Sequence, residues 1–185
     1  MKTRLIFMSA LLIGCGVLFS QTEPQPESAE VILNRAYKQA AREKKNVFVS
    51  FHASWCGWCK KLDASINDPS CSEYFNNNFV FVHLTVLESK DKKNLENPGA
   101  PEMYSKYSGG KAGIPFFLIF DKKGKLLADS FIRKPGDDPE KPGQNVGCPA
   151  TDDEISAFVE ILKKTSNIGD NDIKAIQERF SKNRN

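Results

Sequence analysis

The sequence predicts an α/β fold: a three-layer α/β/α sandwich around a four-stranded mixed sheet, with an additional N-terminal helix. Strand-like and helix-like segments alternate along the chain, and a strand-helix-strand order implies a parallel pair with a right-handed crossover. A later strand-turn-strand segment adds two antiparallel strands. The predicted helices are expected to cover both faces of the resulting sheet. The 185 residues suffice for one domain with its own core.

The first twenty residues are typical of a secretory signal. Lys2 and Arg4 precede an apolar run at 5–19, which is shorter than a membrane-spanning helix, and a polar segment follows at 21–27. We therefore divide the chain into a signal at 1–20, a tether at 21–27 and a single domain at 28–185. The alternative is a buried N-terminal helix.

The segment Leu-Ile-Gly-Cys at 12–15 resembles the lipobox of bacterial lipoproteins, in which the cysteine is lipidated and begins the mature chain. This resemblance implies a lipid anchor at Cys15 and a location in the periplasm or envelope of a bacterium. The alternative is ordinary cleavage near Ser20, which Leu18 disfavours because a small residue is preferred there. Export in either form places the remaining cysteines where disulfides persist.

The charge balance gives no indication of a nucleic-acid partner. The chain carries a formal charge of +3, and the signal contributes two lysine or arginine residues and no acidic ones, so 3 − 2 leaves +1. The lysine-rich segments at 42–45 and 90–93 are short and of mixed sign, which is typical of solvated surfaces.

A helix is expected at 28–46, where apolar residues recur at helical spacing and Asn46 can end it. A strand rich in β-branched and aromatic residues follows at 47–53. The next helix covers 56–67 and ends because an Asp-Pro pair follows it. The two cysteines of this helix therefore lie in its first turn.

The middle of the chain continues the alternation. Residues 69–78 are expected to add a helical turn or two before a strand at 79–87. A polar loop at 88–102 leads into a short helix at 101–107. The apolar segment at 115–120 is the third strand.

A turn at 121–124 and a segment at 125–132 complete a hairpin. A loop at 133–151, dense in Pro, Gly and Asp, follows; a loop of that length is usually functional or mobile. A helix starts at Thr151 with acidic residues in its first turn, and a weaker helix covers 171–180.

Cys56 and Cys59, two residues apart, suggest three kinds of chemistry. A zinc site would need more ligands, and Cys71, Cys148, His52 and His83 offer no suitable ligand spacing, so no metal is expected. A purely structural disulfide would close too short a loop to gain much stability. Thiol–disulfide exchange remains: unpaired amides at a helix N-terminus favour the thiolate of Cys56, and Cys59 can resolve the mixed disulfide.

Two segments carry a family resemblance. Residues 51–62, Phe-His-Ala-Ser-Trp-Cys-Gly-Trp-Cys-Lys-Lys-Leu, resemble the active-site segment of the thioredoxin superfamily. Residues 113–125 resemble its Gly-Ile-Pro segment, whose proline follows a cis peptide bond beside the redox pair. The likeness spans about residues 30–165, and the segment at 66–86 resembles the extracytoplasmic thioredoxin-like proteins.

The resemblance implies roles for individual residues. Cys56 is the nucleophile, Cys59 the resolving cysteine and Pro115 the cis-proline, and the backbone of Ile114 offers hydrogen bonds to an extended substrate chain. Trp55 and Trp58 are expected to form an apolar rim for protein partners, the alternative being local packing against the helix.

The chain also departs from thioredoxins. Ser50 stands where they carry a buried acidic residue, and Gly57-Trp58 replaces their Gly-Pro spacer. His83 falls near the position of the acid's lysine partner, so we consider a proton relay to Cys59, against a histidine satisfied by the backbone. Cys71 and Cys148 either form a second disulfide or remain two separate, partly buried thiols.

These observations predict an exported thiol–disulfide oxidoreductase, a monomer without metal or organic cofactor. It would act on protein disulfides or dithiols and exchange electrons with an upstream redox partner. By resemblance, the reducing direction is favoured. The alternatives are a disulfide oxidase or isomerase of folding proteins, and a non-enzymatic binding or chaperone module whose cysteines stay bonded.

Overall fold

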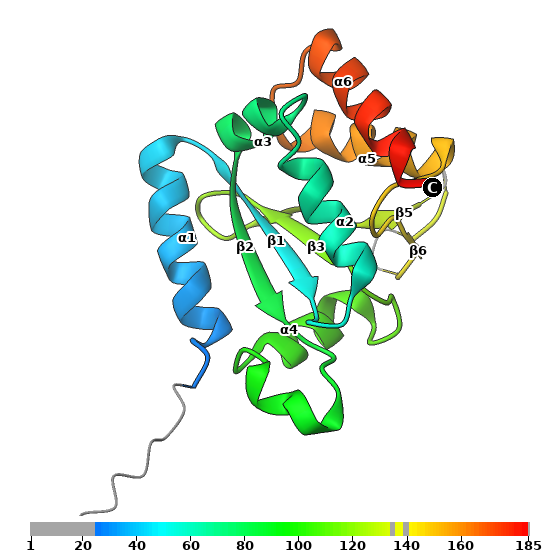
Figure 1. Ribbon diagram of the computed structural model, residues 1–185. Coiled ribbons are helices and arrows are strands. Elements are labelled where there is room, and N and C mark those ends of the chain that lie inside the picture. Colours follow the sequence, from blue (N-terminus) through cyan, green and yellow to red (C-terminus); the bar gives the residue numbers. More distant parts are fainter. Residues whose placement is uncertain (1–24, 134–135, 139–140, 185) are drawn as a thin grey trace, which may run out of the picture.

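The computed structural model describes residues 25–133, 136–138 and 141–184. The predicted signal at 1–20, the lipidation site Cys15 and residues 21–24 of the tether lie outside the described residues. The described chain has three layers, with helices on both faces of a central sheet (Figure 1). Within this part of the chain, no helix is both long and apolar enough to cross a membrane.

The central sheet is mixed, as predicted, with the strand order β2-β1-β3-β4. β1 runs parallel to β2 and antiparallel to β3, and β3 pairs antiparallel with β4. The interior of β1 is buried at five consecutive residues because helices cover both faces, so it shows no polar alternation. The strands are β1 (Asn46–His52), β2 (Phe79–Thr85), β3 (Phe116–Phe120) and β4 (Leu126–Asp129).

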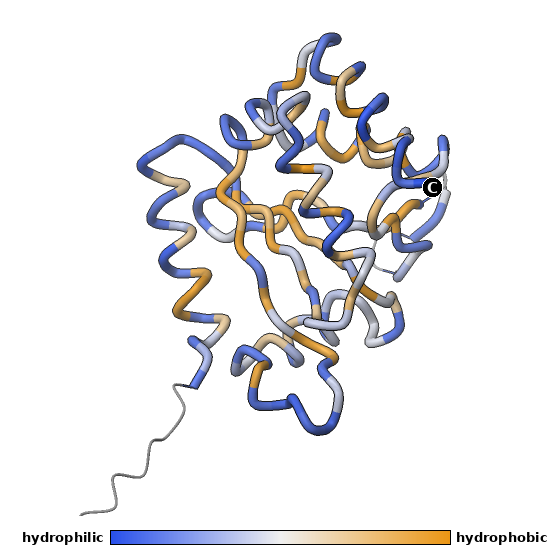
Figure 2. Tube along the Cα trace, viewed as in Figure 1, coloured by the Kyte–Doolittle hydropathy of each residue, from blue (hydrophilic) through white to orange (hydrophobic). Residues whose placement is uncertain are grey.

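One face of the sheet is covered by α1 (Ala29–Glu43) and α4 (Ala100–Ser108). Their buried side chains form one core with the residues of β1, β2 and β3 that point to this face. Figure 2 shows hydrophobic residues along the strands and hydrophilic residues on much of α1. This amphipathic pattern is why the N-terminal helix packs as an additional element on the sheet.

The opposite face carries a second core, which is rich in phenylalanine. The ring of Phe158 contacts Phe75, Phe117 and Phe180, so α5 joins α3, β3 and α6. The elements here are α2 (Gly57–Ile66), α3 (Ser72–Asn78), α5 (Asp152–Thr165), α6 (Asp170–Ser181) and the 3-10 turn η2 (Lys182–Arg184).

The end of the first helix and the content of the polar loop differ from the prediction. The first helix ends at Glu43 because Lys44 adopts a left-handed conformation with φ of 57°. Asn46 therefore begins β1, and its side-chain amide donates to the carbonyl of Thr165 at 2.7 Å. The predicted polar loop contains a 3-10 helix, η1 (Lys90–Leu95).

The predicted strand at 125–132 is wrong in its second half. β4 ends at Asp129, whose carboxylate accepts the amide of Phe131 at 3.0 Å and turns the chain away from the sheet. β5 (Phe131–Ile132) then pairs antiparallel with β6 (Gln144–Asn145). The predicted Pro/Gly-rich loop thus contains a strand.

Candidate functional site

The two cysteines of the pair are joined by a disulfide with an S–S distance of 2.00 Å and a Cα–Cα distance of 5.3 Å. Cys56 is the N-cap of α2, and its Sγ accepts a hydrogen bond from the backbone amide of Cys59 at 3.1 Å. Both residues are buried, with 3% and 2% of their surface exposed. An unpaired amide at a helix N-terminus is thus directed at the sulfur of Cys56, as the sequence predicted.

Two residues, Ala53 directly after β1 and Ile114, pack with the pair. β1 ends at His52, and Ala53 forms a small buried cluster with both cysteines. Ile114 packs against this cluster. The Ile114–Pro115 peptide bond is cis, in agreement with the expectation.

The turn that delivers Cys56 is anchored by Glu88, a residue that the sequence reasoning missed. The carboxylate of Glu88 is 4% exposed and accepts the backbone amide of Ser54 at 2.5 Å and its hydroxyl at 2.8 Å. The adjacent residue Leu87 has a φ of 55° and accepts the indole N–H of Trp55 at 2.9 Å. The sequence feature that could have indicated Glu88 is the position of an acidic residue directly after an apolar strand.

Trp55 and Trp58 are exposed at 59% and 49%, and Leu87 beside them at 42%. Each tryptophan leaves about half of its surface or more exposed to solvent, which is apolar area that a partner could contact. The ammonium of Lys61 lies 4.7 Å from the centre of the Trp58 ring, a cation–π contact. An exposed tryptophan therefore stands directly before each cysteine of the pair.

His83 contacts a side chain of α2 rather than the backbone. Its Nε2 lies 2.8 Å from Oδ1 of Asp63, and both side chains are partly exposed. The centre of the His52 ring lies 5.1 Å from the centre of the His83 ring. Burial is the main cause that lowers the pKa of His52, and the nearby imidazole of His83 adds to it. Ser50, the register partner of His83, is buried. The relay role of His83 stays a prediction.

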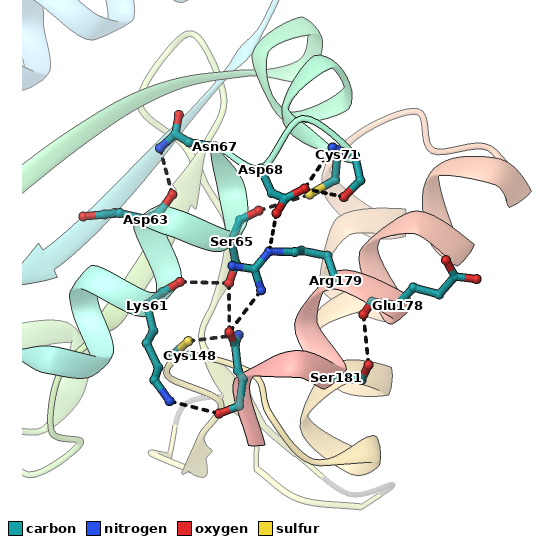
Figure 3. Close-up of polar contacts among 12 residues, drawn as sticks. Lys61, Asp63, Ser65, Asn67, Asp68, Cys71, Cys148, Glu178, Arg179 and Ser181 are labelled. Carbon is teal, nitrogen blue, oxygen red and sulfur yellow. Dashed lines mark hydrogen bonds and ion pairs between the residues drawn. The ribbon is translucent and has the colours of Figure 1, made fainter. Parts of the chain in front are cut away.

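Cys71 and Cys148 do not form the second disulfide considered from the sequence; both are free and buried. Sγ of Cys71 donates to the carbonyl of Ser65 at 3.1 Å, whereas Sγ of Cys148 accepts the side-chain amide of Asn183 at 3.4 Å (Figure 3). The hydroxyl of Ser65 donates to Oδ1 of Asn183 at 3.1 Å. Ser65 and Asn183 therefore form a hydrogen-bonded connection between the two cysteines.

Burial also disfavours the thiolate form of these two cysteines. It raises the pKa of Cys71, and it raises the pKa of Cys148 to about 12. Neither has the exposure or the lowered pKa of a reactive cysteine. Among the described residues, no group of three or more His, Cys, Asp or Glu side chains is arranged to hold a metal ion.

A family model described as thioredoxin-like matches residues 29–122, about half of the chain. The protein disulfide-isomerase of Hordeum vulgare is 26% identical over 98 residues, which cover 50% of this chain and 19% of that protein. Protein disulfide isomerase-like 1-3 of Oryza sativa subsp. japonica is 24% identical over 140 residues, which cover 73% of this chain and 24% of that protein. The chain thus spans about a quarter or less of these relatives.

Solved structures also resemble the chain, among them the following two. The disulphide isomerase from Xylella fastidiosa Temecula1 is 21% identical with a TM-score of 0.45, and the match covers 58% of this chain and 80% of that one. A structure named DsbH oxidoreductase is 20% identical with a TM-score of 0.39, and the match covers 84% of this chain and 95% of that one.

Proposed function

Since this chain belongs to the thioredoxin-like family, we propose that it is a thiol–disulfide oxidoreductase that exchanges protein disulfides through Cys56 and Cys59. The observation that carries this proposal is the placement of the Cys56 sulfur at the N-cap of α2, where it accepts the amide of Cys59. The same amide and the positive end of the helix dipole stabilise a thiolate once the pair is reduced.

The proposed reaction has two balanced steps. The Cys56 thiolate attacks a substrate disulfide, forms a mixed disulfide and releases one substrate thiolate, which takes up a proton. Cys59 then loses its proton and attacks Sγ of Cys56, which regenerates the Cys56–Cys59 disulfide and releases the second substrate thiolate. Two electrons pass from the pair to the substrate, and an upstream dithiol must return them.

Protein substrates suit the surroundings of the pair. Trp55 and Trp58 offer exposed apolar surface beside Cys56, and Ile114 packs against the pair next to Pro115. An extended chain bound along Ile114 would bring its disulfide to the sulfur of Cys56. We further propose that the protein acts as a monomer in a bacterial envelope, which it reaches through its N-terminal signal and where a lipid at Cys15 anchors it.

We favour the reducing direction, because exported proteins that resemble this Trp-Cys-x-x-Cys-Lys segment often act as reductants. Isomerisation is the second candidate, since the curated relatives carry the name protein disulfide-isomerase. The two differ in redox potential: a reductant is expected near that of thioredoxin, at about −270 mV, and an isomerase at about −180 mV.

The test combines turnover, potential and trapping. The reduced protein is expected to reduce insulin disulfides catalytically, and a glutathione titration gives the potential of the Cys56–Cys59 pair. Cys59→Ser is expected to accumulate mixed disulfides, because the resolving step is lost. The double variant Cys56→Ser, Cys59→Ser is the matched control and should trap none.

The outcomes separate the alternatives. A potential near about −120 mV supports an oxidase instead. A potential below about −300 mV, typical of structural disulfides, together with no turnover and no trapped species, contradicts every enzymatic role. That result would favour a binding module whose cysteines stay bonded.

A further inference from the structure

Asn145, on β6, contacts the segment at 112–115 that packs against the redox pair. Its side-chain amide donates to the carbonyl of Ala112 at 3.0 Å and to the carbonyl of Pro115 at 2.9 Å. The two acceptors lie at the two ends of the segment. One side chain therefore spans the segment from end to end.

The amide group of Asn145 is itself held in one orientation. Its Oδ1 accepts the hydroxyl of Ser130 at 2.7 Å and the backbone amide of Gly147 at 3.1 Å. With two donated and two accepted bonds, the hydrogen-bonding capacity of the side chain is filled. A flipped amide would place Oδ1 against the carbonyls of Ala112 and Pro115, so the orientation is determined by the partners.

Ser130 connects this group to the central sheet. It is fully buried, its backbone amide donates to the carbonyl of Phe117 at 3.0 Å, and its hydroxyl accepts the Phe117 amide at 3.2 Å. Phe117 belongs to β3, which starts directly after Pro115. Asn145 thus holds the segment at 112–115 at a fixed position relative to β3.

The contacts leave one residue of the segment available. The carbonyl of Gly113 accepts the hydroxyl of the buried Tyr104 at 3.2 Å, so the carbonyls on both sides of Ile114 are bonded. Among the described residues, the backbone of Ile114 makes no hydrogen bond. Its side chain packs against the cluster formed by Ala53, Cys56 and Cys59. The unbonded backbone groups therefore belong to the residue whose side chain packs against the cluster that contains the disulfide.

We propose that Asn145 is a positioning residue for protein substrates, which fixes the segment at 112–115 so that the Ile114 backbone can pair with an extended peptide next to Cys56. This inference rests on the proposed function. Asn145 lies outside the range that the family model matches, within the Pro/Gly-rich segment at 133–151. That segment therefore contributes to the active site through one amide.

The test compares substrates with and without a peptide backbone, using the full chain. Asn145→Ala is expected to raise the KM for insulin about tenfold while kcat changes less than about twofold, because the loss is one of binding. Turnover of hydroxyethyl disulfide, which has no peptide backbone, and the potential of the pair should stay unchanged. An unchanged KM for insulin in a folded variant overturns the inference and leaves the proposed function intact.

Two further variants protect the test against misfolding. Asn145→Asp keeps the shape and the two accepted bonds but directs a carboxylate oxygen at the carbonyls of Ala112 and Pro115, so the same rise in KM is expected. Asn78→Ala is the matched control: its amide donates to the carbonyl of Tyr74 at 2.8 Å, in α3, and its loss should not change KM. An equal rise in Asn78→Ala overturns the inference.

A measurement independent of turnover separates this inference from the proposed function. Amide chemical shifts of Gly113 and Ile114 in the oxidised protein are expected to move and broaden in Asn145→Asp, but not in Asn78→Ala. Unchanged shifts overturn the positioning role. If the wild type reduces no insulin and the shifts do move, the proposed function and the role in substrate binding fail together, and only the fixing of the segment at 112–115 by Asn145 stands.

Discussion

Cys56 serves as the helix cap and, in the proposed reaction, as the nucleophile with the same sulfur atom. The N-cap position is usually taken by Ser, Thr, Asp or Asn, whose oxygen accepts an amide of the first turn. Here Sγ of Cys56 accepts the amide of Cys59. A serine at 56 would retain the cap, so variants of the pair can be compared without losing the start of α2.

His52 provides a pH-dependent contribution at the scale of one residue. Its pKa is lowered below the usual 6.5, mainly by burial and next by His83, although Asp63 and Glu88 act in the opposite direction. The unfolded chain therefore binds this proton more readily than the folded protein. Stability from neutral His52 is present above about pH 6.5 and is lost as the pH falls through the lowered pKa.

We expect His52→Gln to lose less stability than the wild type between pH 7.5 and pH 5.5, because it removes the group that must be protonated against burial. Urea denaturation of the oxidised proteins at both pH values measures this difference. Parallel losses in the two proteins would show that His52 does not contribute.

At the scale of elements, both parts of the candidate site are held by side chains from loops or short strands. Glu88, in the connection after β2, bonds Ser54 in the turn before α2. Asn145, on the two-residue strand β6, bonds the segment before β3. The regular elements bring the cysteines and Pro115 together, whereas these contacts fix the irregular backbone between them.

The start of α5 gives a prediction on helix capping. The hydroxyl of Thr151 accepts the amide of Glu154 at 3.3 Å, and the Glu154 carboxylate accepts the amide of Thr151 at 3.0 Å. Thr151→Ala removes one half of this capping box and should lower the free energy of unfolding by about 1 kcal/mol. Urea denaturation tests it, with Ser156→Ala on the exposed side of the same helix as control.

The control is expected to be neutral or slightly stabilising, since alanine has the higher helix propensity. A loss in Ser156→Ala equal to that in Thr151→Ala would show that the effect does not come from the cap.

At the scale of the whole molecule, the C-terminal turn η2 ties α2 to the segment before α5. Asn183 bonds Ser65 in α2 through Oδ1 and the carbonyl of Pro149 through its amide, and it also contacts Cys148. Arg179 bonds the carboxylate of Asp68 at 2.8 Å (Figure 3). Cys71 and Cys148 are thus enclosed by segments far apart in the sequence.

This enclosure predicts that the two thiols report global unfolding. In the oxidised protein, iodoacetamide at pH 8 should leave Cys71 and Cys148 unmodified in buffer and modify both in denaturing urea, because burial raises both pKa values. Peptide mapping by mass spectrometry identifies each site. Labelling of either thiol at a rate independent of urea would indicate local opening instead.

The sequence alone determined the α/β architecture, the element order and the position of the redox pair. These features follow from local patterns: apolar runs predict strands, helical spacing predicts helices, and Cys56 and Cys59 follow directly after the predicted strand that became β1. The chain continuity between β1 and α2 therefore placed Cys56 at a helix start before any tertiary contact was known.

Only the tertiary structure decided which distant residues complete the site. Glu88 and Asn145 lie 34 and 30 residues along the chain from their partners Ser54 and Pro115, and no periodicity links such pairs. The tertiary packing also kept Cys71 and Cys148 as separate thiols, since Ser65 and Asn183 provide their polar partners. Hydrogen bonds between irregular segments depend on where the folded sheet brings the chain, which local patterns do not encode.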